Sequence, residues 1–156
     1  MPQTPALLTL NAGSSSLKLA VFEIGSVVRR PIFGSDKRIG LDAARFQIAD
    51  ERGYTVFTKS VPIKTYQQAL KQVLTRLAGV TAKFRLTAIG HRVAHGGPNC
   101  DRPADVTPAL KARLGGLVDL ALLHLPASLA GTAAVTAMRP NLPQITNKDA
   151  RQKLAC

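Results

Sequence analysis

The chain has 156 residues, 46% of them hydrophobic, with 21 basic and 9 acidic side chains. This length and composition exclude an intrinsically disordered chain and predict one compact domain with its own core. The formal net charge of +12 indicates anionic partners, such as nucleotides, phosphorylated metabolites or nucleic acid.

Membrane, secreted and zinc-binding classes are disfavoured by the sequence. The most apolar stretch, Leu117–Leu125, is too short for a membrane span and contains Asp119. The N-terminal Met-Pro-Gln-Thr-Pro lacks the features of a secretory signal, so we expect a cytoplasmic protein without membrane contacts. Cys100 and Cys156 have no paired spacing, which argues against a disulfide scaffold or a zinc site. Because basic residues are dispersed and aromatic residues make up only 4%, nucleic acid is the less favoured anionic partner.

The first third of the chain predicts strands. The apolar segment Ala6–Leu10 is followed by a glycine-serine turn and a second extended segment, and Val27–Arg38 is a third. Phe46–Ala49 and Tyr54–Thr58 flank Asp50-Glu-Arg-Gly53 as a hairpin. An antiparallel start to the sheet is therefore expected.

The next segments alternate between helix and strand. Tyr66–Ala78 has apolar residues at helical spacing, which predicts an amphipathic helix that packs on the sheet and ends at Gly79. Phe84–Ala94 then returns to a strand.

The last part of the chain predicts two further helices. Thr107 as N-cap and Pro108 in the first turn indicate the start of one helix. An alanine-rich helix is expected after Pro126, and the turn at residues 140–143 should end it. The segment Thr146–Lys153 has neither an apolar run nor alternation, so we expect no strand there and an incomplete sheet with exposed apolar surface.

The first candidate site is Asn11-Ala-Gly-Ser-Ser-Ser-Leu-Lys18, which places hydroxyls, a glycine and a cation directly after an apolar strand. If the chain is extended from Ser14, then Ser14, Ser16 and Lys18 share one face, while the intervening apolar residues face a core. Gly13 allows successive N–H groups to turn toward one anion. The segment is either a phosphate-binding turn or a plain hairpin turn.

The second candidate is Ile89-Gly-His-Arg-Val-Ala-His-Gly-Gly97, a strand that ends in paired glycines. Arg92 points to one face, whereas His91 and His95 point to the other. Arg92 is either a bidentate clamp for a carboxylate or phosphate, or a salt-bridged strand arginine. The two histidines would form a metal pair at this spacing only on a helix, so zinc is not expected.

The third candidate is His124, in the apolar segment Leu120–Pro126, where one helix ends and a proline restarts the chain. This histidine is either a hydrogen-bonded core residue or a group that stabilises negative charge developing on a phosphoryl group.

These three motifs, in this order, resemble the N-terminal part of the acetokinase (acetate kinase) family. Asn11–Lys18 resembles the first signature of the family, and Ile89–Gly97 resembles the second. Leu120–Leu129 is similar to the family segment Leu-Ala-Pro-Leu-His-Asn-Pro-Ala-Asn-Leu at seven of ten positions. The resemblance extends from Leu7 to Pro143.

The resemblance implies an α/β fold, namely a ribonuclease-H-like domain of the actin-like ATPase superfamily with a mixed sheet flanked by helices. It assigns residues 1–143 to an acetokinase-type N-terminal domain and leaves residues 144–156 as a divergent tail, with the C-terminal domain absent. We therefore expect a truncated or frameshifted chain that is inactive alone. A homodimer is implied for the full-length family.

The reaction implied by the resemblance is reversible phosphoryl transfer from ATP to acetate, with Mg²⁺, giving ADP and acetyl phosphate. The implied phosphate-binding and ATP-binding residues are Asn11, Ser14, Ser16 and Lys18. Asn11 would also contact Mg²⁺. Arg92 would hold the acyl carboxylate and the transferring phosphoryl group, and His124 would stabilise the transition state.

Departures from the family pattern leave alternatives open. In the implied acyl pocket of Arg92, Ala94 and Leu123, alanine stands at 94 where the family usually has valine. A kinase for propionate or another short-chain acid is therefore one alternative. Asp149 is in register with the catalytic aspartate of the family, but its surroundings differ from the motif. The other alternative is a non-catalytic basic domain that binds phosphate or nucleic acid.

Overall fold

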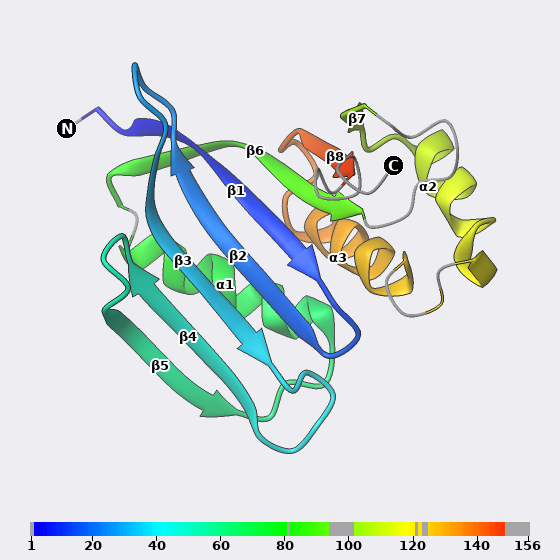
Figure 1. Cartoon of the computed structure of the whole chain (residues 1–156), viewed down its shortest axis with the longest axis horizontal. Coiled ribbons are helices and arrows are strands. Elements are labelled where there is room, and N and C mark those ends of the chain that lie inside the picture. The colour runs from blue at the N-terminus through cyan, green and yellow to red at the C-terminus, as the bar shows by residue number, and fades with distance from the viewer. Residues whose placement is uncertain (1, 81, 94–101, 121, 123–124, 149–156) are drawn as a thin grey trace, which may run out of the picture.

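The computed structural model of the chain describes residues 2–80, 82–93, 102–120, 122 and 125–148 (Figure 1). Within these residues, eight strands form one sheet in the order β5-β4-β3-β2-β1-β6-β8-β7. The strands are β1 (Thr4–Ala12), β2 (Ser16–Glu23), β3 (Arg29–Lys37), β4 (Ala44–Asp50), β5 (Thr55–Val61), β6 (Phe84–Val93), β7 (Ala104–Asp105) and β8 (Gln144–Lys148). The helices are α1 (Tyr66–Val80), α2 (Pro108–Gly115), the short 3₁₀ helix η1 (Val118–Leu120) and α3 (Leu125–Met138).

The sheet combines an antiparallel meander with a parallel half. Strands β1 to β5 pair with their neighbours in sequence, all antiparallel. On the other side of β1, β6 pairs with it in parallel, β8 pairs with β6 in parallel, and β7 pairs with β8 antiparallel. The predicted hairpin is confirmed as β4 and β5, and Gly53 takes a positive φ of 87° at its turn. The mixed α/β sheet predicted from the sequence is therefore confirmed.

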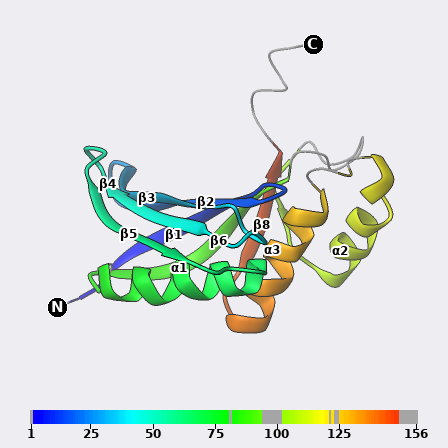
Figure 2. The ribbon, with the colours of Figure 1, turned by 90° about the horizontal axis from the view of Figure 1, so that it is seen from below.

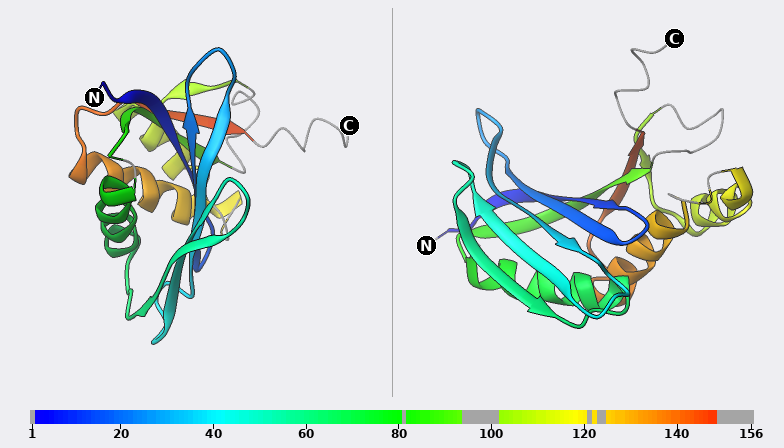
Figure 3. Two further views of the ribbon diagram at one scale, coloured as in Figure 1. Left: turned by 90° about the vertical axis from the view of Figure 1, so that its left-hand side faces the viewer. Right: turned by 60° about the horizontal axis from the view of Figure 1, so that its bottom comes forward.

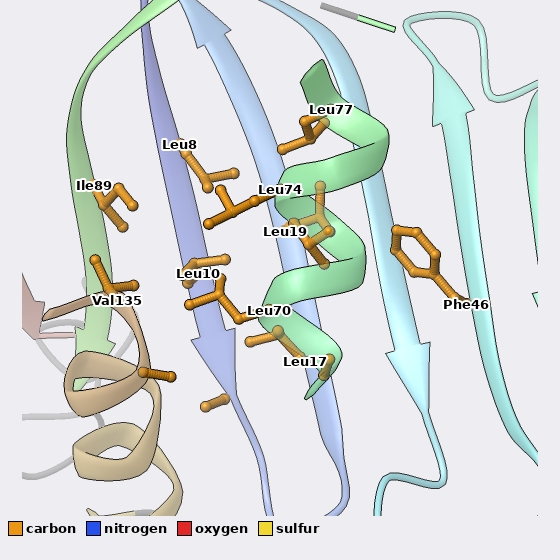
Figure 4. Packing of buried hydrophobic residues seen from close by; sticks show 14 of the residues in the cluster. Leu8, Leu10, Leu17, Leu19, Phe46, Leu70, Leu74, Leu77, Ile89 and Val135 are labelled. Carbon is orange, nitrogen blue, oxygen red and sulfur yellow. The ribbon is translucent and has the colours of Figure 1, made fainter. Parts of the chain in front are cut away.

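The helices α1 and α3 lie against one face of the sheet, as the edge-on views show (Figures 2 and 3). Alternate residues of β1 and β2 point to these helices and are buried, among them Leu8, Leu10, Leu17 and Leu19 (Figure 4). They pack with one stripe of α1 and with Val135 of α3 in a single apolar cluster. The buried α1 residues are Ala69, Leu70, Val73, Leu74 and Leu77. This pattern confirms the predicted amphipathic helix.

Two predicted helix starts are confirmed, and one predicted helix end is wrong. Thr107 Oγ1 accepts a hydrogen bond from the Leu110 N–H at 3.1 Å, and Pro108 is the first residue of α2. The alanine-rich helix is α3. However, α1 continues through Gly79 to Val80. Glycine costs a helix only about 1 kcal/mol relative to alanine, which does not by itself end it.

The prediction that the sheet lacks a last strand is also wrong. β8 lies in the segment predicted to be a divergent tail, and it pairs on both sides, with β6 and with β7. Its inward-facing residues are polar but hydrogen-bonded: Thr146 Oγ1 donates to the Ala104 carbonyl oxygen at 3.2 Å, and Gln144 bonds to His91. Strand formation therefore does not require the apolar run on which the prediction depended.

None of the helices in the described residues is long and apolar enough to cross a membrane.

Candidate active site

A hollow of about 580 Å³ lies on the face of the sheet opposite α1 and α3. We call this face the open face. The polar residues that line the hollow include Asn11, Lys18, Arg92 and Asn147, and its apolar lining includes Leu7, Phe22, Ala88 and Ile145. The two predicted motifs Asn11–Lys18 and Ile89–Gly97 thus contribute side chains to one concave surface.

Strand register explains why these polar residues meet. Asn11 on β1 pairs directly with Lys18 on β2. On the other side of β1, Leu10 pairs with His91, so Asn11 and Arg92 are the next residues along two parallel strands. Arg92 in turn pairs with Asn147 on β8. A polar row therefore crosses four strands of the open face, from Lys18 to Asn147.

The predicted side-chain alternation is confirmed where the chain is described. Leu17 and Leu19 are buried, whereas Lys18 is exposed. On β6, His91 is buried and Arg92 is exposed. Ser128 Oγ on α3 donates to the Arg92 carbonyl oxygen at 3.3 Å, which ties the helix layer to the strand position that carries this arginine.

The serine turn, residues 13–16, is a tight hairpin turn between β1 and β2. The Gly13 N–H donates to the Ser16 carbonyl oxygen at 2.8 Å. A Cβ at position 13 would lie 2.9 Å from Ser16 Oγ, so a larger residue there would require this hydroxyl to rotate away. The strand resumes at Ser16, whereas Ser14 lies in a bend and is exposed. The chain is therefore not extended from Ser14, so the condition for Ser14 to share a face with Ser16 and Lys18 is not met, and the alternation begins at Ser16.

We call the face of the sheet that α1 and α3 cover the helix face. On the helix face of β6, His91 is part of a buried polar network. Its Nε2 lies 2.8 Å from Gln144 Oε1, and Gln144 Nε2 donates to Thr136 Oγ1 at 2.9 Å. Burial lowers the pKa of His91 to about 4, so the ring is neutral at pH 7. This histidine thus joins β6, β8 and α3 on the face opposite Arg92.

Asp36 is a second buried titratable residue, and it does not line the hollow. It pairs with Leu17 and shares the helix face of the sheet with it. Neither carboxyl oxygen has a hydrogen-bond partner within the described part of the chain. Burial raises the pKa of Asp36 to about 6.

The described residues include no group of three or more His, Cys, Asp or Glu side chains that could hold a metal ion. The side-chain oxygen donors that line the hollow are the amides of Asn11 and Asn147 and the hydroxyl of Thr9. Such donors fit an ion that keeps most of its ligands from water and phosphate, as Mg²⁺ does, and do not fit an all-protein cage.

Four of the predicted site residues, Ala94, Leu123, His124 and Asp149, lie outside the described residues. Conversely, Asn147 was not predicted, although it lines the hollow beside Arg92. The pairing of β8 with β6 places it there, and the polar sequence of β8 gave no strand signal from which this position could be inferred.

The sequence matches the Acetokinase family over residues 6–151. The chain belongs to the acetokinase family. Acetate kinase from Rhodopseudomonas palustris (strain ATCC BAA-98 / CGA009) is 35% identical over 142 residues, which cover 89% of this chain and 36% of that protein. This acetokinase-family chain therefore spans about a third of the length of the curated relative.

Solved structures of the family share the fold. The crystal structure of Porphyromonas gingivalis acetate kinase matches with a TM-score of 0.85 and 26% identity, over 93% of this chain and 37% of that one. A propionate kinase from Francisella tularensis subsp. tularensis SCHU S4 matches with a TM-score of 0.82 and 26% identity, over the same shares. The acetokinase-family chain thus has the α/β fold, with a mixed sheet, that the sequence resemblance implied.

Proposed function

We propose that this chain forms the phosphoryl-transfer part of a kinase that moves a phosphoryl group between ATP and acetate. The observation that carries the proposal is the polar row on the open face, in which Asn11, Lys18 and Arg92 line one hollow. Membership of the acetokinase family supports the same reaction.

The side chains of the hollow suit a reaction that depends on charge and position. In the forward direction, an acetate oxygen attacks the γ-phosphorus, the bond to the bridging oxygen breaks, and ADP leaves. Negative charge on the transferring group is balanced by Lys18 and by the guanidinium of Arg92, which can hold two oxygens at once. Asn11 and the serine turn contribute amide and hydroxyl groups at the phosphate end.

The proposed metal is Mg²⁺ bound together with the nucleotide phosphates. Asn11 would supply one oxygen ligand to it. When bound, the ion neutralises phosphate charge during the transfer.

The remaining proposed roles come from the sequence motifs. His124 would stabilise the transition state, and Asp149 would be the catalytic aspartate. Ala94 and Leu123 would line the acyl pocket together with Arg92.

Propionate is the second candidate substrate. Alanine at 94 in place of valine removes two methyl carbons, and one buried methylene is worth about 0.8 kcal/mol. A relative of similar fold is a propionate kinase. If Ala94 lines the pocket, Ala94→Val shifts the kcat/KM ratio toward acetate by up to about tenfold. An unchanged ratio in an active enzyme contradicts this placement.

For residues 1–156 alone we expect no turnover. The hollow is open on one face of the sheet, so the chain excludes little water from a bound phosphoryl group. The measurement is hydroxamate formation from acetate, MgATP and hydroxylamine, beside a heat-inactivated sample. Turnover by the verified chain would show that a complete site lies within 156 residues.

A chimera tests the proposed activity directly. This chain replaces its matching 142-residue segment in the R. palustris acetate kinase, and hydroxamate formation is measured. We expect turnover, and Arg92→Gln should reduce kcat/KM by about a hundredfold, because the charge-assisted contacts to the reacting groups are lost. Lys59→Gln, an exposed lysine on β5, is the matched control and should leave the rate unchanged. A folded chimera without activity, or an Arg92→Gln chimera of full activity, contradicts the proposal.

A further inference from the structure

A second hollow, of about 460 Å³, adjoins the first on the open face and shares Lys18 with it. It lies over β2, β3 and β4, away from Arg92. The side chains that define it are Lys18, Arg30, Phe33, Ser35, Lys37 and Gln47. The proposed kinase chemistry uses only Lys18 among these residues.

The register of the meander arranges the cations along β3. Phe33, Ser35 and Lys37 are alternate residues of one strand and therefore share a face. Lys18 pairs with Ser35 across the β2–β3 ladder. The guanidinium of Arg30 lies over the ring of Phe33, 4.5 Å from its centroid. Arg30 thus contacts Phe33, Lys18 pairs with Ser35, and Lys37 is the third position, so the cations are distributed over three strand positions that are about 6.6 Å apart.

No carboxylate offsets these cations within the described rows of the open face. Ser16 pairs with Lys37, and Lys37 pairs with Arg45, so the row beside the serine turn adds a further cation. The neighbouring acid, Asp36, is buried on the opposite face. The ion pairs between described side chains, Arg29–Glu51 and Lys64–Asp42, involve none of the residues that define the second hollow.

We propose that this second hollow binds a chain of phosphates, either the tail of a nucleotide or free inorganic polyphosphate. A single phosphate cannot reach from Phe33 to Lys37, because four residues of strand span about 13 Å. A linear polyanion can contact all three cations in turn. Ser35 supplies a neutral hydroxyl donor between them, and Gln47 Nε2, which donates one hydrogen to Thr55 Oγ1 at 2.6 Å, has a second hydrogen to donate. The stacked position of Arg30 orients its guanidinium before the ligand binds.

Isothermal titration of the whole chain with sodium tripolyphosphate tests this site, with orthophosphate as the short-ligand control. We expect tripolyphosphate to bind about tenfold more tightly than orthophosphate, and binding to weaken as salt is raised. Lys37→Gln and Arg30→Gln should each weaken tripolyphosphate binding by about three- to tenfold. Lys59→Gln changes the net charge equally, but Lys59 pairs with Phe46 and so lies on the helix face of the sheet. It should leave the affinity unchanged.

Arg92→Gln separates this site from the proposed active site, because it should leave tripolyphosphate binding at the second hollow intact. Titrations of the Arg92→Gln variant with ATP distinguish the two sources: equal affinity for ATP and tripolyphosphate assigns the site to phosphate chains in general, and tighter ATP binding that Lys37→Gln weakens assigns it to nucleotides. Equal losses in Lys59→Gln and Lys37→Gln would overturn the proposal in favour of unspecific charge. So would a single-stranded oligonucleotide that binds with sequence preference at physiological salt, since it would identify nucleic acid as the partner.

Discussion

His91 donates a hydrogen bond from Nε2 to Gln144 Oε1, and the direction of this bond follows from its neighbours. The Thr136 hydroxyl donates to the Thr132 carbonyl oxygen at 2.9 Å, so it accepts from Gln144 Nε2. The amide oxygen of Gln144 is therefore the atom that faces the imidazole, which must carry its proton on Nε2. A single glutamine thus joins the helix α3 to two parallel strands whose other face carries Arg92 and Asn147.

Gln144→Leu should destabilise the fold by about 1–3 kcal/mol, because it leaves the His91 N–H buried without an acceptor. The free energy of unfolding in urea measures this loss. Gln67→Leu, at an exposed position of α1, is the control and should change stability by less than about 0.5 kcal/mol. Equal stability of Gln144→Leu and the natural chain would show that the bond contributes nothing.

Asp36 should make the protein less stable as pH rises. Its folded pKa of about 6 lies above the unfolded value, so the folded state holds the proton more tightly. Its favourable contribution is complete below the unfolded pKa of about 3.9 and is lost as pH rises through 6. As pH rises from 4 to 7.5, the free energy of unfolding of Asp36→Asn, measured in urea, should therefore increase by about 1–3 kcal/mol relative to that of the natural chain. A difference that does not vary with pH would contradict this assignment.

His91 should make the protein less stable as pH falls. Its folded pKa of about 4 lies below the unfolded value, so the unfolded state binds the proton first. The stability that the neutral ring contributes is complete above pH 6.5 and is lost as pH falls through 4. In an Asp36→Asn background, where the opposing carboxyl is removed, unfolding free energy should fall steadily from pH 6.5 to pH 4. A flat profile in that variant would place the His91 pKa near its ordinary value.

Gly34→Ala should lower the stability of the fold more than most substitutions of similar size. A Cβ at this position would lie 2.4 Å from the Gln47 carbonyl oxygen, which belongs to the backbone of the paired strand β4. The strands must move apart, at a cost of about 1–3 kcal/mol. Gly79→Ala is the matched control: open space surrounds it inside α1, and helix propensity predicts a gain of about 0.5–1 kcal/mol. Thermal unfolding of both variants checks the two signs, and a tolerated Gly34→Ala would contradict the packing.

Local patterns in the sequence predicted most of the strands and helices, because alternation, turn residues and caps act over a few neighbours. The same alternation placed Arg92 and Lys18 on exposed faces. It could not show that these faces are the same one, since that depends on the pairing of β1 with both β2 and β6.

The strand β8 shows the limit of such patterns. Its inward residues are Gln144 and Thr146, which satisfy their polar groups through partners far away in sequence. No local signal encodes those partners, so Asn147 was not recognised as a neighbour of Arg92. The same limit applies to the positive charges. Lys18, Lys37 and Arg45 are far apart in sequence, and only the register of the paired strands brings them together.

The central place of β1 has a consequence for the order in which the protein folds. Pairing within the meander from β1 to β5 joins strands that follow one another, so each hairpin closes a short loop. Thr4 meets Phe84 only after the whole meander and α1 have been synthesised. Because closing long loops slows folding, we expect the antiparallel half to form first on the ribosome and β6 to dock later. Until then β1 is an unpaired edge, and the nascent chain is most exposed to wrong strand pairing at the strand that later carries Asn11.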